Sequence, residues 1–349
     1  MVSAESKSAD YREPPRLSLP PQAAPPGAAI DADLEPEAAP DAAPETRTAT
    51  VDARLHGQRL DKALVVMAPE FSRSHLQHLI ERGHVQLDGV VAATASRRLR
   101  AGQRLQLELV PTEESQAFRP QAMALQLLYE DEHLLVLDKP AGLVVHPAPG
   151  NWQGTLLNGL LAHHVAAATL PRAGIVHRLD KDTSGVMMVG KSLPAVTALV
   201  RAMAAREVHR RYLALAHGEL TEAAFSVDAP IGRDPQVRVR MAVVAVAAGG
   251  RASRTDVRRV AVRDGISALS CTLHSGRTHQ IRVHLASRGH PLLADALYGG
   301  RPALGLQRQA LHATELRLAH PITGVALAFD CPPSPDFASA WAQVAGTAA

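Results

Sequence analysis

Residues 174–185 read Gly-Ile-Val-His-Arg-Leu-Asp-Lys-Asp-Thr-Ser-Gly. From His177 to Asp182 this stretch holds two carboxylates, two cations and a histidine, with apolar runs on both sides. A charge cluster between two strand-like runs is costly to bury unless its members pair with one another, and such clusters are frequent at working sites. The alternative is an exposed loop of surface ion pairs, which contribute little to stability. The stretch therefore predicts a loop between strands that is either a functional site or a salt-bridged surface.

The composition predicts a multidomain chain with a basic body. A length of 349 residues suggests two or three domains. Hydrophobic residues make up 46% and aromatic residues 3%, so we expect a core of Leu, Val and Ala. Residues 1–50 carry four Lys/Arg against nine Asp/Glu, whereas residues 51–349 carry 33 against 25. A basic body with an acidic tail suits a polyanionic partner.

Cysteine usage and hydropathy point to the cytoplasm. The two cysteines, Cys271 and Cys331, are far apart and form no Cys-x-x-Cys pair. Neither a disulfide framework nor a thiolate zinc site is indicated, and a reducing compartment fits best. We see no secretory signal and no apolar run of the ~18–20 residues that span a bilayer. We therefore expect a cytoplasmic protein that does not bind a membrane.

Shifts in pattern divide the chain. Residues 1–51, rich in Ala, Pro and acids, predict a disordered tail. Residues 52–111 show helical spacing at 60–67, an N-cap at Ser72, a hairpin signal at Asp88-Gly89 and alternating leucines at 105–109. Residues 112–124 read as a linker, 125–341 as a second domain, and 342–349 as a C-terminal tail.

Two short helices and a hairpin with a basic face resemble the S4 RNA-binding domain. The matching pattern runs from Arg59-Leu60-Asp61 through Ser72-Arg73-Ser74 to Gly83-His84-Val85. The resemblance makes Arg59, Lys62, Arg73 and Arg82 candidates for RNA contacts. The alternative is a small basic α+β module without that role.

Three further segments accompany the 174–185 stretch. They are Lys139-Pro140-Ala141-Gly142-Leu143-Val144-Val145-His146-Pro147, Arg210-Arg211-Tyr212-Leu213-Ala214, and Gly276-Arg277-Thr278-His279-Gln280-Ile281-Arg282-Val283-His284-Leu285-Ala286, the last followed by Gly289-His290-Pro291. With them, residues 125–332 resemble the RluA family of RNA pseudouridine synthases, in the family's order. Residues 309–313 and 320–324 look most like its RluD subgroup, which modifies large-subunit ribosomal RNA.

The resemblance implies a fold and a reaction. The fold is α+β: a mixed, largely antiparallel sheet flanked by helices, with the active site in a central cleft and an S4 domain ahead of it. The reaction breaks the glycosidic bond of uridine, turns the base and rejoins carbon to carbon. It is redox-neutral and uses no outside nucleophile, so we expect neither a cofactor nor a metal.

The resemblance also assigns three catalytic residues. Asp180 is the catalytic carboxylate, acting as nucleophile or stabilising a cationic sugar; the order of steps stays open. Arg282 matches the position that pairs with it, and an adjacent cation lowers an Asp pKa by about 1–3 units. We expect Arg282 on a helix capped by Thr278 and stopped by Gly289. Tyr212 matches the active-site tyrosine, and strand alternation sends it to the face opposite Leu213.

Other basic residues are candidates for RNA contacts and base flipping. Arg178 matches the arginine that fills the space left by the flipped base; its alternative role is a phosphate contact. Arg277, Arg210 and Arg211 are candidates for phosphate contacts, which position RNA without reading sequence; a solvated face is the alternative. His177 fits a structural role in the loop backbone. The pairs His163-His164 and His279/His284 lack metal-site spacing.

These expectations converge on isomerisation of uridine to pseudouridine in 23S ribosomal RNA, at the helix 69 stem-loop. The partner is RNA, free or within a pre-50S particle, and we expect a monomer. One alternative is the same chemistry on another 23S site or on transfer RNA. The other is a non-catalytic RNA-binding or ribosome assembly factor, which an S4 domain alone would permit.

Overall fold

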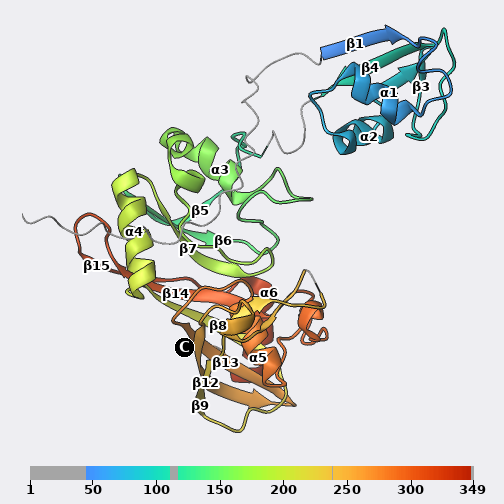
Figure 1. Cartoon of the computed structure of the whole chain (residues 1–349). Coiled ribbons are helices and arrows are strands. Elements are labelled where there is room, and N and C mark those ends of the chain that lie inside the picture. Colours follow the sequence, from blue (N-terminus) through green and yellow to red (C-terminus); the bar gives the residue numbers. More distant parts are fainter. Residues whose placement is uncertain (1–44, 111–116, 238, 347–349) are drawn as a thin grey trace, which may run out of the picture. The chain divides into compact units, whose positions relative to one another are not determined.

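Two domains with separate hydrophobic cores make up the computed structural model, which describes residues 45–110, 117–237 and 239–346 (Figure 1). The small domain comprises residues 45–110, and the large domain lies within residues 117–346. Among the helices of these ranges, none contains an apolar stretch of the length that a membrane span requires.

The small domain packs two helices on a four-stranded sheet of order β1-β4-β2-β3. Its elements are β1 (Glu45–Thr50), α1 (Leu60–Met67), α2 (Arg73–Glu81), β2 (Val85–Leu87), β3 (Val90–Val91) and β4 (Arg104–Leu109). Ser72 caps α2 as predicted, because its hydroxyl accepts a hydrogen bond from the backbone N–H of His75. Asp88 and Gly89, with φ of 54° and 78°, form the predicted hairpin turn.

The predicted boundary of the N-terminal tail at residue 51 was wrong. Residues 45–50 form β1, which pairs antiparallel with β4 from Glu45 opposite Leu109 to Thr50 opposite Arg104. Threonines at 46, 48 and 50 favour a strand because they are β-branched. They are polar, however, so the segment shows no apolar alternation that would set it apart from the acidic tail before it. Residues 1–44 of the predicted tail lie outside the described residues.

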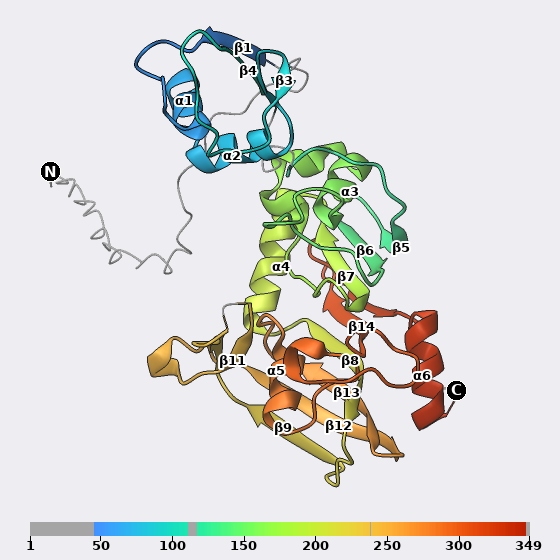
Figure 2. The same ribbon diagram turned by 90° about the vertical axis from the view of Figure 1, so that its right-hand side faces the viewer.

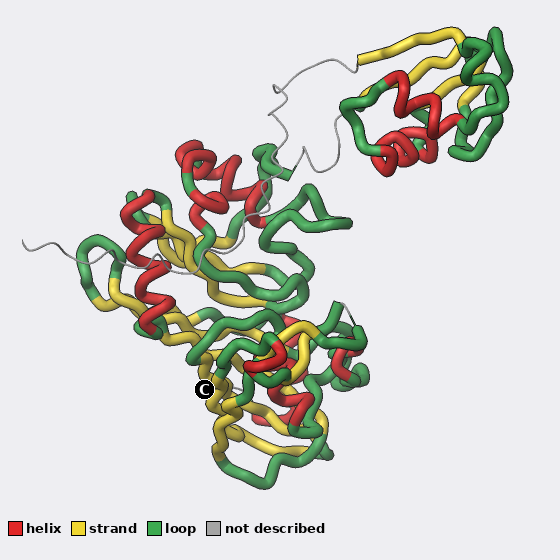
Figure 3. Tube along the Cα trace, in the orientation of Figure 1, coloured by secondary structure: helices red, strands yellow, loops and turns green. Residues whose placement is uncertain are grey.

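A nine-stranded mixed sheet organises the large domain, as the predicted fold class requires (Figure 3). Its order is β5-β6-β7-β14-β8-β13-β12-β9, and β15 pairs with β14. Only β7 and β14 pair in parallel; the other described pairs in the sheet are antiparallel. The strands are β5 (Gln126–Glu130), β6 (Leu134–Lys139), β7 (Ser184–Gly190), β8 (His209–His217), β9 (Ala224–Asp228), β12 (Arg254–Arg263), β13 (Ile266–Leu273), β14 (Leu311–Ala319) and β15 (Ala326–Asp330).

Helices cover both faces of this sheet. The helices are α3 (Leu156–His163), α4 (Leu193–Ala205), α5 (Gln280–Ser287) and α6 (Pro335–Ala345), and a separate hairpin joins β10 (Ile231–Arg233) to β11 (Met241–Val243). Tyr212 and Ala214 of β8 share the main core with Ile281 of α5. Leu215, on the other face, packs with Phe337 of α6. The two helices therefore lie on opposite faces of β8 and β13 (Figure 2).

Two further boundaries differ from the sequence prediction. Residues 117–124, predicted as linker, are attached to α3, because the Asn158 side-chain amide donates to the carbonyls of Ala117 and Arg119 at 3.0 and 2.8 Å. Helix α6 continues to Ala345, so the first half of the predicted C-terminal tail is helical, and Val344 is buried. Residues 347–349 lie outside the described residues.

The parallel junction at the centre of the sheet fixes the start of β7. Ser184 and Gly185 pair with His312 and Ala313 of β14. Gly185 has a φ of 114°, and a Cβ there would lie 2.1 Å from the carbonyl oxygen of Ala313. Only glycine permits this approach, so residues 174–185 end at a rigid point in the middle of the molecule's largest sheet.

Candidate active site

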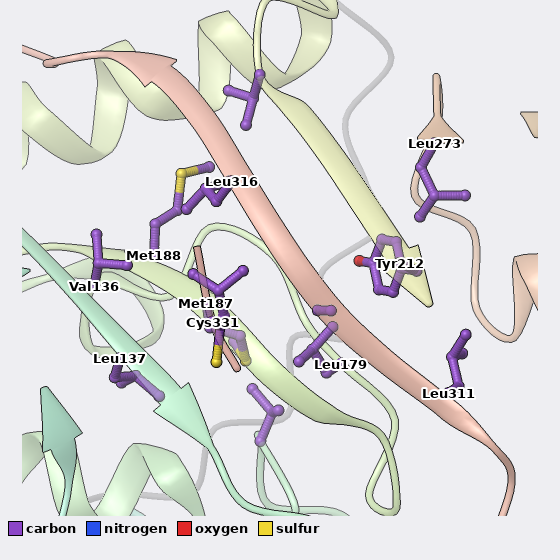
Figure 4. Packing of buried hydrophobic residues seen from close by; sticks show 14 of the residues in the cluster. Val136, Leu137, Leu179, Met187, Met188, Tyr212, Leu273, Leu311, Leu316 and Cys331 are labelled. Atoms are coloured by element: carbon purple, nitrogen blue, oxygen red, sulfur yellow. The ribbon is translucent and has the colours of Figure 1, made fainter. Parts of the chain in front are cut away.

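The loop that leads into β7 carries Asp180 at the edge of the main core. Leu179 is 4% exposed and packs among the core residues, near Tyr212 and Leu311 (Figure 4). Its neighbour Asp180 lines a cavity instead. Burial of Leu179 thus anchors the loop and holds the carboxylate at the cavity wall.

Lys139 holds the same loop from β6. Its side chain is completely buried, and its ammonium donates to the carbonyls of Pro140, Leu143 and Lys181 at 2.7, 3.0 and 3.0 Å. Burial lowers its pKa to about 8, against the opposing effect of Asp182. A buried cation that uses all three donors on backbone carbonyls has a structural role, joining residues 139–143 to the loop beside Asp180.

The cavity has a volume of about 590 Å³ and is strongly basic. Among its lining residues Asp180 is the one carboxylate, and they also include six arginines: Arg172, Arg178, Arg206, Arg210, Arg277 and Arg282. The volume lies within the usual range for ligand sites. Such a lining is suited to binding a polyanion, and Asp180 is the one carboxylate of the wall that could take part in chemistry.

Asp180 is paired through one of its two oxygens. Arg282 Nη1 donates to Asp180 Oδ2 at 2.9 Å, and His279 Nε2 lies 4.0 Å from the same oxygen. Within the described residues, Asp180 Oδ1 accepts no hydrogen bond, and the side chain is 15% exposed. The carboxylate therefore has one oxygen held by Arg282 and one available to a ligand.

A second carboxylate holds Arg282. Asp295 is 1% exposed and accepts from Arg282 Nε and Nη2, both at 2.8 Å. Burial alone would lower the pKa of Arg282, but the hydrogen bonds of Asp295 and the charges of both carboxylates raise it. Arg282 is therefore a permanent cation shared by two acids, as predicted for its pairing with Asp180.

Tyr212 forms part of the cavity wall from β8. Alternation places it on the face opposite Leu213, as predicted, and its ring is 5% exposed beside Leu273 and Leu311 (Figure 4). Burial raises the pKa of its hydroxyl, and Asp180 adds to this effect. The phenol therefore stays neutral near pH 7 and offers a flat apolar face and a hydroxyl.

His177 stabilises the loop backbone, in agreement with its predicted structural role. Its Nε2 accepts a hydrogen bond from the backbone N–H of Met188 at 3.0 Å. Burial, together with the nearby Arg210, lowers its pKa to about 3. The ring is consequently neutral at physiological pH and joins the loop to β7.

The predicted cap of α5 was wrong. The helix begins at Gln280 rather than next to Thr278, and its N-cap His279 has a φ of 57°. The Gln280 amide oxygen accepts from the backbone N–H of Arg277, while its nitrogen donates to Thr255 Oγ1 on β12. The Gln280 side chain thus ties the segment before α5 to β12, and no side chain caps the helix. The spacing of residues gives no signal for this arrangement.

The two arginines before Tyr212 point to opposite faces of β8. Arg210 is 6% exposed and lines the cavity; within the described residues its Nε has no hydrogen-bond partner, and burial lowers its pKa. Arg211 does not line the cavity, and it forms an ion pair with Glu315 on the other face. Strand alternation therefore brings only one of the two predicted RNA contacts to the site.

The remaining predicted contacts lie at exposed positions, except for the partly buried Arg59. Arg178 and Arg277 line the cavity with exposed side chains. In the small domain, Asp61 is completely buried and accepts from Arg59 at 3.0 Å and Arg73 at 2.7 Å, which ties α1 to α2. These two arginines therefore have a structural role in addition to any RNA contact. Lys62 and Arg82 are exposed.

Some residues at the site were not predicted. Asp295 and Tyr298 contact Arg282 and His279, and His146 and Arg172 line the cavity. Local spacing gives no signal for Asp295, which pairs with an arginine 13 residues away only because the chain turns back. In the described ranges no group of three or more His, Cys, Asp or Glu side chains is arranged to hold a metal ion.

Comparison with known proteins supports both predicted resemblances. Residues 133–287 match the family described as RNA pseudouridylate synthase, and residues 58–105 match the S4 domain. A solved structure, Human RNA Pseudouridylate Synthase Domain Containing 1, is similar with a TM-score of 0.49 and 24% identity over 66% of this chain and 89% of that chain.

Several curated relatives carry the name Ribosomal large subunit pseudouridine synthase D. The one from Nitrosomonas europaea is 46% identical over 298 residues, which cover 83% of this chain and 85% of the relative. The one from Xanthomonas campestris pv. campestris is 46% identical over 80% of this chain and 86% of its own length. The one from Escherichia coli O6:H1 is 43% identical over 82% and 90%.

Proposed function

Since this chain belongs to the RNA pseudouridylate synthase family and is an RNA pseudouridine synthase, we propose that it converts uridine to pseudouridine in 23S ribosomal RNA, with Asp180 as the catalytic carboxylate. The observation that carries the proposal is the ion pair between Asp180 and Arg282 on the wall of a basic cavity. The name of the curated relatives, ribosomal large subunit pseudouridine synthase, supports the choice of RNA.

Asp180 supplies the charge that the reaction needs. The N1–C1′ bond of uridine breaks, the uracil turns, a C5–C1′ bond forms, the hydrogen of C5 leaves as a proton, and N1 takes up a proton. Arg282 donates to Oδ2, which leaves Oδ1 to meet the nucleotide as nucleophile or as a stabilising charge. Both roles require that this oxygen face the cavity.

The other cavity residues position the RNA. The Tyr212 ring stacks on the target base, and its neutral hydroxyl serves proton transfer. A base inside a helix must be flipped out to reach the cavity, and Arg178 at the exposed rim takes its place in the stack. Arg210 and Arg277 contact phosphates or base carbonyls. The small domain adds binding through Arg59, Lys62, Arg73 and Arg82.

The substrate within the ribosomal RNA is the helix 69 stem-loop, free or in an assembling pre-50S particle. The resemblance of residues 309–313 and 320–324 to one subgroup supports this choice. The enzyme acts in the cytoplasm as a monomer and requires no cofactor, because the bond exchange is internal to the nucleotide.

The test is tritium release from RNA that carries uridine labelled at carbon 5. Substrates are a helix 69 transcript, a transfer RNA pool and pre-50S particles. Asp180→Ala should lower release by at least about 100-fold. Asp182→Ala is the matched control, because it removes a carboxylate two residues away that does not line the cavity.

Each outcome discriminates between functions. Release from helix 69 that vanishes in Asp180→Ala supports substrate and residue together. Release from transfer RNA alone overturns the ribosomal substrate and keeps the chemistry. Full activity of Asp180→Ala overturns the catalytic assignment, and a folded protein that is inactive on all three substrates favours an RNA-binding factor.

A further inference from the structure

A short turn behind the cavity contacts two of the residues that line it. The turn runs from Asp295 through the 3-10 segment η5 (Ala296–Tyr298). Neither Asp295 nor Tyr298 lines the cavity, yet Asp295 binds Arg282 and Tyr298 binds His279. We infer that this turn is the positioning element of the active site: Asp295 sets the orientation of Arg282, and Tyr298 sets the tautomer of His279. The inference rests on the proposed function of Asp180.

The Asp295 contact fixes the direction of the guanidinium. Its two oxygens accept from Nε and Nη2 of Arg282, both at 2.8 Å, in a bidentate fork. A guanidinium is planar and rigid, so a fork on one edge determines where the remaining nitrogen points. That nitrogen, Nη1, donates to Asp180 Oδ2 at 2.9 Å. Asp295 therefore places the cation that holds Asp180.

The turn itself has little freedom. The backbone N–H of Gly300 donates to the Asp295 carbonyl at 2.8 Å, and a Cβ at Gly300 would lie 1.8 Å from the Leu292 carbonyl oxygen. The Tyr298 ring lies against Arg282, with 5.1 Å between its centroid and the guanidinium carbon. Backbone closure and the ring thus brace the fork from two sides.

The Tyr298 hydroxyl decides which nitrogen of His279 carries hydrogen. It accepts from the backbone N–H of Met241 at 3.0 Å, and it lies 2.9 Å from His279 Nδ1. A hydroxyl has one hydrogen to donate. Among the described residues, His279 Nδ1 is the one acceptor within hydrogen-bond distance of this hydroxyl, so we assign the hydrogen to that contact. The remaining hydrogen of the neutral ring is then on Nε2, which lies 4.0 Å from Asp180 Oδ2.

This tautomer gives the cavity a neutral donor beside Asp180. His279 lines the cavity, and its φ of 57° is a strained conformation for a residue other than glycine. Burial lowers its pKa, so the ring stays neutral. A donor that faces Asp180 Oδ2 complements Arg282 and leaves Asp180 Oδ1 unobstructed for the nucleotide.

The Arg282 half is tested by a double-mutant cycle on the full-length enzyme. Asp295→Asn should lower kcat for tritium release by about tenfold or more, while the KM for RNA stays within about threefold, because Asp295 does not touch RNA. In an Arg282→Lys background the same change should cost less than about threefold, since the fork is already lost. Asp131→Asn, which removes a hydrogen-bonded carboxylate outside the cavity, is the control and should leave kcat unchanged.

The His279 half is tested by nitrogen-15 NMR of the free, full-length protein labelled at histidine. Wild type should show neutral His279 with its hydrogen on Nε2, and Tyr298→Phe should show loss of that preference. Donation to Nδ1 disfavours protonation, so the acid limb of kcat should move to higher pH in Tyr298→Phe.

Two results overturn the inference: an equal loss from Asp295→Asn in both backgrounds, or a wild-type His279 with its hydrogen on Nδ1. The NMR measurement requires no RNA. If the wild-type enzyme were inactive on every RNA, the proposed function would be wrong. The NMR result would still show whether Tyr298 sets the tautomer of His279.

Discussion

At the scale of single residues, burial of Arg210 costs the ligand-free protein folding free energy. Its guanidinium is buried, yet its Nε has no hydrogen-bond partner within the described residues, and lowering of its pKa by burial expresses the same cost. A buried charge without compensation destabilises a fold. A ligand that supplies the missing hydrogen-bond acceptor would compensate this charge, and RNA offers phosphate and carbonyl oxygens.

Replacing Arg210 should therefore move stability and binding in opposite directions. Arg210→Met should raise the melting temperature of the large domain and weaken RNA binding about tenfold, or about 1.4 kcal/mol. Unfolding is followed by tryptophan fluorescence, because Trp152 and Trp341 both lie in that domain. Binding is measured by filter retention of a helix 69 transcript.

The neighbouring arginine provides the control. Arg211→Met removes one of the two arginine partners of Glu315 on the opposite face, so it should lower stability and leave RNA affinity unchanged. Loss of stability in Arg210→Met, or equal binding defects in the two variants, would contradict the assignment.

His177 predicts an acid-dependent loss of stability. Its pKa falls from about 6.5 in the unfolded chain to about 3 in the fold. The unfolded state therefore binds the proton first as pH drops. The stabilisation is complete above about pH 6.5 and is lost toward pH 3, by up to about 1.4 kcal/mol per pH unit.

In His177→Asn the slope of unfolding free energy against pH should flatten between about pH 4 and pH 6.5, as measured by urea unfolding with tryptophan fluorescence. His209→Asn changes an exposed histidine of β8 and should keep the wild-type slope. Equal slopes in all three proteins would exclude His177 as the source.

At the scale of elements, the parallel pairing of β7 with β14 depends on one glycine. A Cβ at Gly185 would collide with the Ala313 carbonyl at 2.1 Å and would also require a φ of 114°. Gly185→Ala should lower the free energy of unfolding of the large domain by more than about 3 kcal/mol, because neither strand can move within the sheet.

Gly265, in the turn between β12 and β13, separates the two causes. Its φ is 72°, but a Cβ there would have no atom within 4 Å. Gly265→Ala should therefore cost only the backbone strain, about 1–2 kcal/mol. If the two substitutions lower the free energy of unfolding in urea by the same amount, the close contact with β14 is not the reason that position 185 requires glycine.

Elements with a strong periodic pattern were predictable, and contacts that depend on chain reversal were not. Ser72 predicts the start of α2, and alternation in β8 predicts the placement of Tyr212, because both signals are local. The same alternation places Arg211 on the face opposite Tyr212, so it would have excluded Arg211 from the predicted site. The fork from Asp295 to Arg282 depends on a turn between α5 and η5, which no periodicity encodes.

Motif resemblance supplied what local patterns could not. It brought Asp180 and Arg282 together across 102 residues, and the structure places them 2.9 Å apart. It gave no account of the start of α5, where His279 stands at the N-cap instead of Thr278 and no side chain caps the helix. It was also silent on β1, whose six residues lie outside the matched S4 region of 58–105.

At the scale of the whole molecule, charge is divided between parts of the chain. Residues 1–44 hold three Lys/Arg and eight Asp/Glu, whereas the folded remainder is basic. Phosphate contacts release counterions, so affinity for RNA falls steeply with salt. An acidic segment tethered to a basic body competes with RNA for the same cations, most strongly where screening is weak.

Removal of residues 1–44, which keeps β1 intact, should therefore tighten binding to a non-target RNA by about threefold at about 50 mM salt and by little at about 200 mM. Turnover on the target RNA at saturation should not change, because the cavity is built from residues 146–311. The control is a full-length chain whose eight tail acids are replaced by Asn and Gln, which keeps the length and removes the charge. Tighter binding in both proteins establishes an electrostatic effect; tighter binding in the truncation alone would mean that the tail acts by excluded volume instead.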